Sequence, residues 1–262
     1  MFSVLDRDRL RDRVLEIASS DPRVVAGALL GSLAHDGGDK WSDIDLMFAV
    51  TDDVPVPEVL EDWSQTLVRE VDAVKLFDLS SGPITYRVFL LPDSLELDLS
   101  FAPASEFGAG GPKFRLLFGE AVEPAWDPPP PASELFGYAV HHALHARACI
   151  ERGRHWQAEY WISAVRDHAL HLACRSRGLD GYYGRDFDEL PDDLVGQLES
   201  ALVQSLDGGE LRRALRRAVA VLLTMSDEAP ELADMVGPQL GELVPAAATW
   251  SDQTLDSEHT FE

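Results

Sequence analysis

The sequence predicts an α+β protein in two parts, a small domain with a mixed sheet followed by an α-helical bundle. Up to about residue 119, short apolar and β-branched runs alternate with two amphipathic helical stretches. The segment 123–132, EPAWDPPPPA, then contains four successive prolines, which favour an extended linker. Beyond it the periodicity is helical. We therefore predict a sheet domain over 1–122, a proline-rich linker over 123–132, a helical bundle over 133–249 and a disordered acidic tail over 250–262.

In the first domain, hydrophobic spacing separates helices from strands. Leu10, Val14 and Ile17 recur at helical spacing among charged residues, and a second helix follows the prolines at 55 and 57. The remaining apolar runs are strand-like, and the break Pro92-Asp93-Ser94 makes the last two a hairpin. The predicted helices cover 4–19 and 57–70, and the predicted strands cover 23–30, 43–50, 72–78, 84–91 and 95–102.

The hydrophobic spacing of the second half predicts consecutive helices and no sheet. Long amphipathic segments separated by short polar or glycine-containing breaks are typical of a helical bundle. The predicted helices lie near 133–152, 155–177, 191–206, 209–225 and 229–245.

Composition limits the possible partners. A formal net charge of −24 argues against binding nucleic acid, which needs basic surface to displace counterions. The same charge would attract cationic substrates, although simple solubility explains it equally well. No apolar run is long enough to cross a membrane, no signal peptide is visible, and the two cysteines fit a reduced, cytoplasmic setting.

The residues that suggest chemistry are concentrated in 28–50, ALLGSLAHDGGDKWSDIDLMFAV, where two apolar runs flank a polar stretch. Side chains alternate along a strand, so Asp43 and Asp45 are expected to share a face, with Cα atoms about 7 Å apart. Paired carboxylates suit Mg²⁺, which takes oxygen ligands and shares them with substrate phosphates. Gly31 allows the backbone to approach a phosphate closely, and Ser32 adds a hydroxyl. The stretch therefore predicts a nucleotide site.

Gly-Ser followed at this distance by Ser-Asp-Ile-Asp-Leu resembles the signature of the DNA polymerase β-type nucleotidyltransferase superfamily. The chain is most similar to its antibiotic-modifying branch, the aminoglycoside and lincosamide nucleotidyltransferases. The resemblance is specific over 24–50 and looser to about 119. It implies that Gly31, Ser32 and Ser42 bind the nucleotide and that Asp43 and Asp45 bind metal. Many relatives carry Arg-Gly after Gly-Ser; this chain does not, and Lys40 is the substitute we consider.

The resemblance also implies two Mg²⁺ ions and a third carboxylate from a later, adjacent strand. The segment 95–101 alternates, with leucines and Phe101 on one side and Glu96, Asp98 and Ser100 on the other. We assign the third acid to Asp98, with Glu96 as the alternative. A solvent-facing strand surface would give the same alternation.

The helical half offers weaker candidates. Glu159 is a candidate general base, although a Glu–Arg pair within the helix explains it as well. Arg166 and His171 resemble the Arg-x4-His motif of HEPN domains, some of which are ribonucleases. His141 and His145 stand at metal-sharing spacing, but no third ligand is evident, so surface histidines are the simpler interpretation.

The resemblance implies an enzyme that transfers a nucleoside monophosphate, AMP from ATP or another nucleoside triphosphate, to a hydroxyl of a small-molecule acceptor. The acceptor would be an aminoglycoside or lincosamide, selected between the two domains, and a homodimer could complete the cleft. Two alternatives stay open. One is a toxin–antitoxin-type protein that adenylylates or binds a partner protein, and the other is a HEPN-type ribonuclease.

Overall fold

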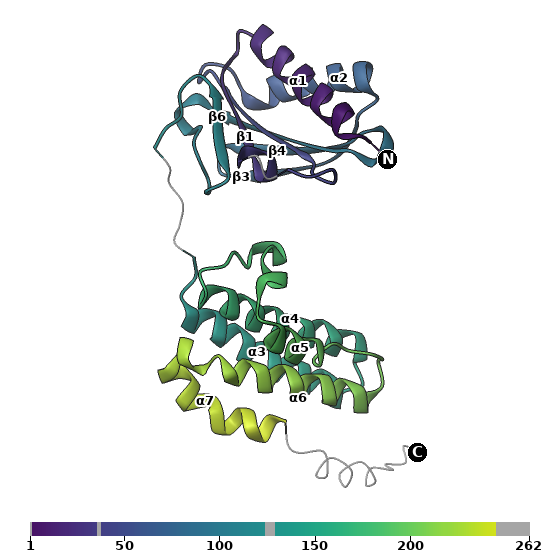
Figure 1. The fold of residues 1–262 in the computed structure, drawn as a ribbon, viewed down its shortest axis with the longest axis vertical. Helices are drawn as coiled ribbons and strands as arrows, with labels where there is room; N and C mark the ends of the chain where they lie inside the picture. Colours follow the sequence, from purple (N-terminus) through teal and green to yellow (C-terminus); the bar gives the residue numbers. More distant parts are fainter. Residues whose placement is uncertain (1, 36–37, 124–128, 245–262) are drawn as a thin grey trace, which may run out of the picture. The chain divides into compact units, whose positions relative to one another are not determined.

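A six-stranded sheet and seven α-helices make up the part of the chain that the computed structural model describes, residues 2–35, 38–123 and 129–244 (Figure 1). The chain divides into two compact units, Met1–Pro128 and Pro129–Glu262. The first unit contains the whole sheet and the second is helical, which confirms the predicted α+β class. Residues 124–128 of the proline-rich segment and the whole predicted tail lie outside the described residues, so the linker and the tail stay predictions.

The first unit has two α-helices and six strands, and both α-helices and five of the strands lie close to their predicted positions. The helices are α1 (Val4–Ser20) and α2 (Val56–Val71), and a 3-10 helix, η1 (Gly31–His35), follows the first strand. The strands are β1 (Val24–Leu30), β2 (Ile44–Val50), β3 (Val74–Ser81), β4 (Ile84–Leu90), β5 (Glu96–Pro103) and β6 (Phe114–Phe118).

The strands lie in the order β3-β4-β5-β2-β1-β6. The β4–β5 pair is the antiparallel hairpin that the sequence predicted. The central pair, β2 and β5, is parallel, while the other pairs of the sheet are antiparallel. A parallel pair needs a crossover connection, and the chain segment from α2 through β4 supplies it. Two strands far apart in sequence therefore start at the same end of the sheet.

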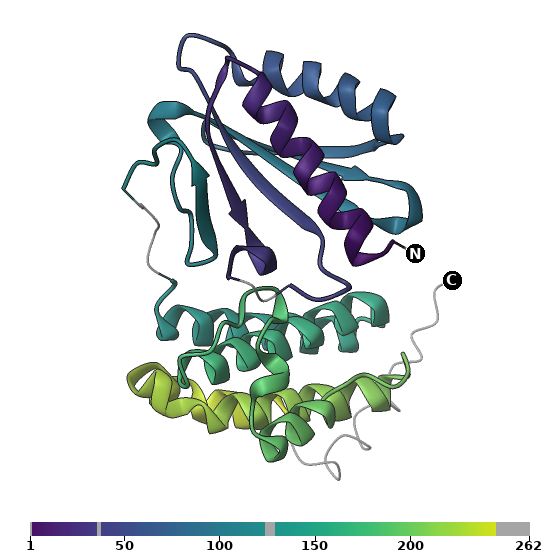
Figure 2. The same ribbon diagram turned by 45° about the horizontal axis from the view of Figure 1, so that its top comes forward.

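Helices α1 and α2 cover one face of this sheet (Figures 1 and 2). Alternate residues of β2 and β5 point into that interface, where Phe48, Trp63 and Phe101 form a cluster with ring centroids 5.0 to 5.6 Å apart. The Trp63 indole N–H donates to Asp21 at 2.9 Å, so the large ring is buried without an unsatisfied donor. The intervening residues of β2 and β5 must face the opposite side of the sheet.

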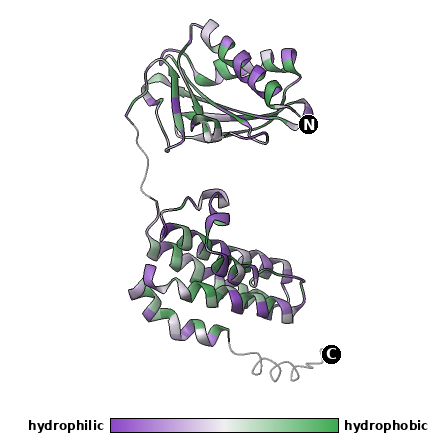
Figure 3. Cartoon of the chain, in the orientation of Figure 1, coloured by the Kyte–Doolittle hydropathy of each residue, from purple (hydrophilic) through white to green (hydrophobic). Residues whose placement is uncertain are grey.

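The second unit is an all-helical bundle whose helices carry hydrophilic and hydrophobic residues on the same element (Figure 3). The longest helices, α3 and α4, pack against each other and against α6 around a core of alanine, valine, leucine and isoleucine. No helix of the described residues is long and apolar enough to cross a bilayer. The helices are α3 (Ala132–Glu151), α4 (His155–Arg175), α5 (Asp192–Glu199), α6 (Gly208–Thr224) and α7 (Pro230–Leu243).

Two elements differ from the prediction. The helix expected over 191–206 ends at Glu199, because the Arg213 guanidinium takes the carbonyls of Ser200 and Leu202 that a longer helix would use. Strand β6 was not predicted, since five residues at a sheet edge carry too little periodicity. It forms because β1 offers it an open edge.

The aromatic cluster should be the main source of stability in the first unit. Trp63→Ala removes a side chain only 2% exposed and should lower the free energy of unfolding by about 3–5 kcal/mol. Val68→Ala on the same helix is the control, because Val68 is 49% exposed and should cost little. Urea unfolding followed by circular dichroism measures both. Equal losses in the two variants would contradict this assignment.

Candidate functional site

Parallel pairing of β2 with β5 brings two acids together on the sheet face opposite the helices. The register sets Ile44 against Leu97 and Asp45 against Asp98. Both hydrophobic partners are fully buried in the core beneath α1 and α2, so both carboxylates point to the other face. Side chains directly opposite on neighbouring strands have Cβ atoms about 5 Å apart. Like charges are therefore held side by side at the start of two strands.

The proximity of these acids affects the pKa of Asp98. Burial, followed by the charges of Asp45, Glu96 and Asp43, raises the pKa of the Asp98 carboxyl to about 7. Its Oδ1 atom is shielded from solvent and finds no hydrogen-bond partner in the described part of the chain. Three acids from two separate segments thus act on the Asp98 carboxyl. Desolvation is the larger cause of the shift, and repulsion adds to it.

Asp43 lies immediately before β2 and not within the strand. We expected Asp43 and Asp45 to alternate on one strand, but β2 begins at Ile44. Ser42 closes the turn, since its Oγ accepts from the Asp39 N–H at 2.9 Å and donates to Asp39 Oδ1 at 3.1 Å. The hydroxyl predicted to bind nucleotide is therefore engaged within the turn. Lys40 lies over the Trp41 ring, 4.7 Å from its centroid.

Gly31 and Ser32 lie beside these acids at the start of η1. Gly31 has φ +60°, and a Cβ built on it would lie 2.0 Å from Asp45 Oδ2. Only glycine permits this backbone and leaves room for the Asp45 carboxylate. The Ser32 Oγ is shielded from solvent and lacks a hydrogen-bond partner among the described residues. The structure thus places Gly31, Ser32, Asp45 and Asp98 in one neighbourhood.

The donor set has the chemistry that a divalent cation requires. Within residues 2–35, 38–123 and 129–244, no three His, Cys, Asp or Glu side chains are already arranged as a metal centre. The buried oxygen of Asp98 without a partner nevertheless fits a hard cation, which takes carboxylate oxygens and would offset the repulsion among the acids. Asp43, Asp45 and Asp98 are the residues that would hold it.

The candidates of the helical unit have ordinary partners. Glu159 lies on α4, where its Oε1 accepts from the Ser163 hydroxyl at 2.8 Å. The Arg166 Nη2 atom forms an ion pair with Asp167 Oδ1 at 3.6 Å. His171 contacts the Asp167 carbonyl through Nδ1 at 2.7 Å, and its ring packs edge-on against Phe187. This Arg and His are thus each engaged in local structure, and Glu159 as a base stays a prediction.

A row of stacked rings between α3 and α4 was not predicted. His142 lies at its centre, with ring centroids 5.0 Å from His168 and 4.9 Å from Trp161, and Tyr138 stacks on His168 at 5.7 Å. His145 extends the row beyond Trp161. Burial lowers the pKa of His168 to about 4, with the charges of His142 and His171 adding to the effect. The aromatic spacing on both helices could have suggested a shared face.

Asp98→Asn should stabilise the protein in a pH-dependent way. The folded-state pKa is raised, so the folded carboxyl keeps its proton between about pH 4 and 7 while the unfolded one loses it, and stability declines across that range. The variant should therefore unfold at higher urea concentration than the wild type at pH 8 and should show a smaller advantage at pH 4. Asp53→Asn, an exposed acid of the same unit, is the control. A wild-type advantage at pH 8 would contradict the burial of a strained carboxylate.

Protonation of His168 should weaken the helical unit. Its pKa is lowered in the folded state, so the unfolded chain binds the proton first and stability is lost as the pH falls from about 6.5 towards 4. His168→Gln should reduce the loss of the urea midpoint between pH 7 and pH 5. His155→Gln, at the start of α4, should retain the wild-type pH dependence. If the urea midpoint of His168→Gln falls between pH 7 and pH 5 as much as that of the wild type, the lowered pKa of His168 is refuted.

Comparisons with known proteins add little to this geometry. No family model matches the chain, and no curated protein is similar in sequence. Among solved structures, an aminoglycoside 6-adenyltransferase from Bacillus subtilis is similar over 88% of this chain and 96% of that chain, with 15% identity and a TM-score of 0.36. So loose a superposition carries no weight for the function of this protein.

Proposed function

We propose that the protein is a nucleotidyltransferase that transfers AMP from ATP to a hydroxyl of a small molecule and releases pyrophosphate. One observation supports this most. The parallel register sets Asp45 against Asp98, whose buried Oδ1 has no hydrogen-bond partner among the described residues, and Gly31-Ser32 lie beside the pair. Carboxylates on neighbouring strands next to a close-approach glycine are the parts that phosphate transfer needs. The sequence resemblance to nucleotidyltransferases supports the same activity.

Each residue has a defined task in this proposal. Gly31 lets the main chain come close to the β- and γ-phosphates, and the free Ser32 hydroxyl donates to them. Asp43, Asp45 and Asp98 would hold Mg²⁺, which would neutralise charge on the phosphate oxygens. Asp98 also orients the acceptor hydroxyl towards the α-phosphorus. The acceptor oxygen bonds to that phosphorus, the bond to pyrophosphate breaks, and the hydroxyl proton passes to a base, for which Glu159 is our candidate.

Charge favours a cationic acceptor. The chain carries a net charge of −24, and an acidic surface concentrates polycations such as aminoglycosides around it. A lincosamide is the second acceptor class that the sequence resemblance suggests. The fold itself does not choose between acceptors, because one scaffold can support many substrates.

The test is pyrophosphate release from ATP, and from the other nucleoside triphosphates, with Mg²⁺ and a panel of aminoglycosides and lincosamides. Mass spectrometry should find the acceptor carrying one nucleoside monophosphate. Asp45→Asn should lower kcat by about 10²–10³-fold, since it removes charge stabilisation at the reacting phosphate. Asp53→Asn should not.

The proposal fails if no acceptor in the panel promotes pyrophosphate release. It also fails in its assignment of the site if Asp45→Asn retains full activity while it binds nucleotide normally. Circular dichroism of each variant separates loss of function from loss of fold.

A further inference from the structure

A buried arginine on α1 has no role in the site described above. The buried stripe of this helix consists of Arg7, Leu10, Val14 and Ala18, and Arg7 is its only charged member. Its side chain is 5% exposed. Arginine is almost never this buried unless its charge is paired or hydrogen-bonded. The contacts of Arg7 therefore show how its buried charge is stabilised.

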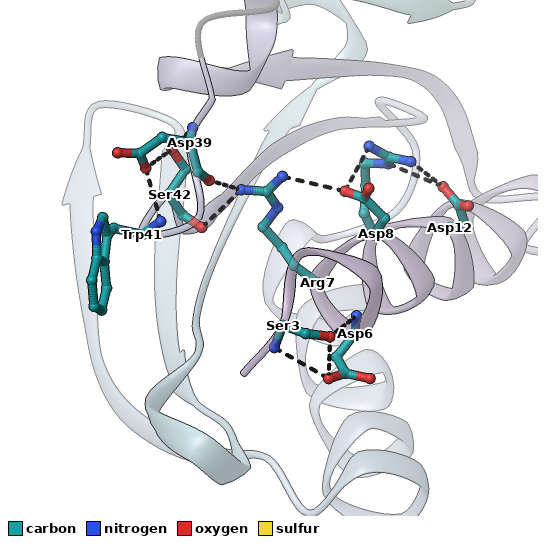
Figure 4. A network of polar contacts seen from close by, with 9 residues as sticks. Ser3, Asp6, Arg7, Asp8, Asp12, Asp39, Trp41 and Ser42 are labelled. Atoms are coloured by element: carbon teal, nitrogen blue, oxygen red, sulfur yellow. Dashed lines mark hydrogen bonds and ion pairs between the residues drawn. The ribbon is translucent and has the colours of Figure 1, made fainter. Parts of the chain in front are cut away.

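Arg7 contacts the turn that enters β2 (Figure 4). Its Nη1 donates to the main-chain carbonyls of Asp39 and Ser42. Its carboxylate contact, to Asp8, is long at 3.5 Å. The guanidinium thus serves mainly to hold main-chain oxygens of one turn.

That turn is closed by its own hydrogen bonds. The Trp41 N–H donates to Asp39 Oδ1 at 2.8 Å, and the side chain of Ser42 bonds to Asp39 as described above. Ser42 immediately precedes Asp43. A movement of the Ser42 carbonyl therefore moves the peptide that carries Asp43.

The same end of α1 also holds the loop before β5. The Phe2 N–H donates to the Asp93 carbonyl at 3.2 Å. Asp93 and Ser94 both have positive φ, 61° and 63°, an unusual backbone for non-glycine residues. From this turn the chain runs directly into β5 and Asp98. A single Ser3–Asp6 capping box fixes the helix start between the two contacts (Figure 4).

We infer that residues 2–7 are a brace between the two loops that lead into the acid-bearing strands, and that Arg7 is a positioning residue for Asp43 and Asp45. This inference rests on the proposed function for its catalytic consequence. Arg7 acts through the main chain, since its hydrogen bonds with described residues go to the carbonyls of Asp39 and Ser42 and to Asp8, not to Asp43 or Asp45. Loss of the Arg7 side chain should impair the alignment of the reacting groups more than the binding of the nucleotide.

The kinetic test compares Arg7→Met, Arg7→Lys and a control, Arg11→Met. Arg11 lies one turn along α1, and its hydrogen bonds and ion pairs with described residues go to Asp8 and Asp12, both on the same helix. Arg7→Met should lower kcat about 10- to 100-fold with a nearly unchanged KM for ATP, because small misplacements of reacting groups are costly. Arg7→Lys, which keeps a cationic donor, should recover part of the loss. Arg11→Met should keep the wild-type kcat.

A second readout needs no turnover. Lys40 lies exposed within the braced turn, so trypsin should cleave after Lys40 several-fold faster in Arg7→Met and at the wild-type rate in Arg11→Met. Mass spectrometry identifies the cut. If the wild type releases no pyrophosphate with any acceptor, the proposed function fails, and the cleavage rate alone decides whether the brace exists.

A purely structural Arg7 gives a different result. An apolar methionine in its place would then preserve kcat and leave the Lys40 cut unchanged, even if the urea midpoint moved. Either a wild-type kcat or a wild-type cleavage rate in folded Arg7→Met overturns the inference.

Discussion

Parallel pairing of β2 with β5 is the constraint on which the first unit depends. It fixes Asp45 opposite Asp98, and burial of the Asp98 carboxyl, to which the charge of Asp45 adds, raises the pKa of Asp98 to about 7. A protein gains no stability from this arrangement. It persists because the opposite face of the same strands is locked into the core by Ile44, Leu97 and their neighbours. Slipping either strand by one residue would expose that hydrophobic set.

Helices α1 and α2 therefore stabilise the site through the sheet. Phe48 and Phe101, from the two acid-bearing strands, meet on Trp63 of α2. Trp63 in turn is hydrogen-bonded to Asp21, whose carboxylate also pairs with Arg23 and has a pKa lowered to about 2. The stabilising contacts of Asp21 thus lie on the sheet face that α1 and α2 cover, and the repulsion between Asp45 and Asp98 lies on the opposite face. Strain of this kind is common at functional sites, where stability is exchanged for chemistry.

In the helical unit, the stacking of histidine rings opposes their protonation. Its principal helices meet through a stack of imidazole and aromatic rings, and His168 is held neutral there by burial. Neutral imidazoles pack as flat aromatic surfaces, but protonated ones repel each other. The bundle is consequently best suited to neutral pH, although its alanine-rich core is independent of protonation.

The sequence by itself determined the alternation of the strands, the two-part organisation and the candidate acids, because these depend on local periodicity and residue chemistry. It could place Asp98 on the polar side of a strand, but it could not say that Asp98 lies against Asp45. It also misplaced Asp43 on the strand and missed β6 and the brace, although Arg7 on an otherwise apolar stripe was a visible signal. Only the tertiary structure decided that β2 pairs with β5, and in which register. The β2–β5 pairing joins residues more than fifty positions apart, and its energy comes from a core that no short window of sequence contains.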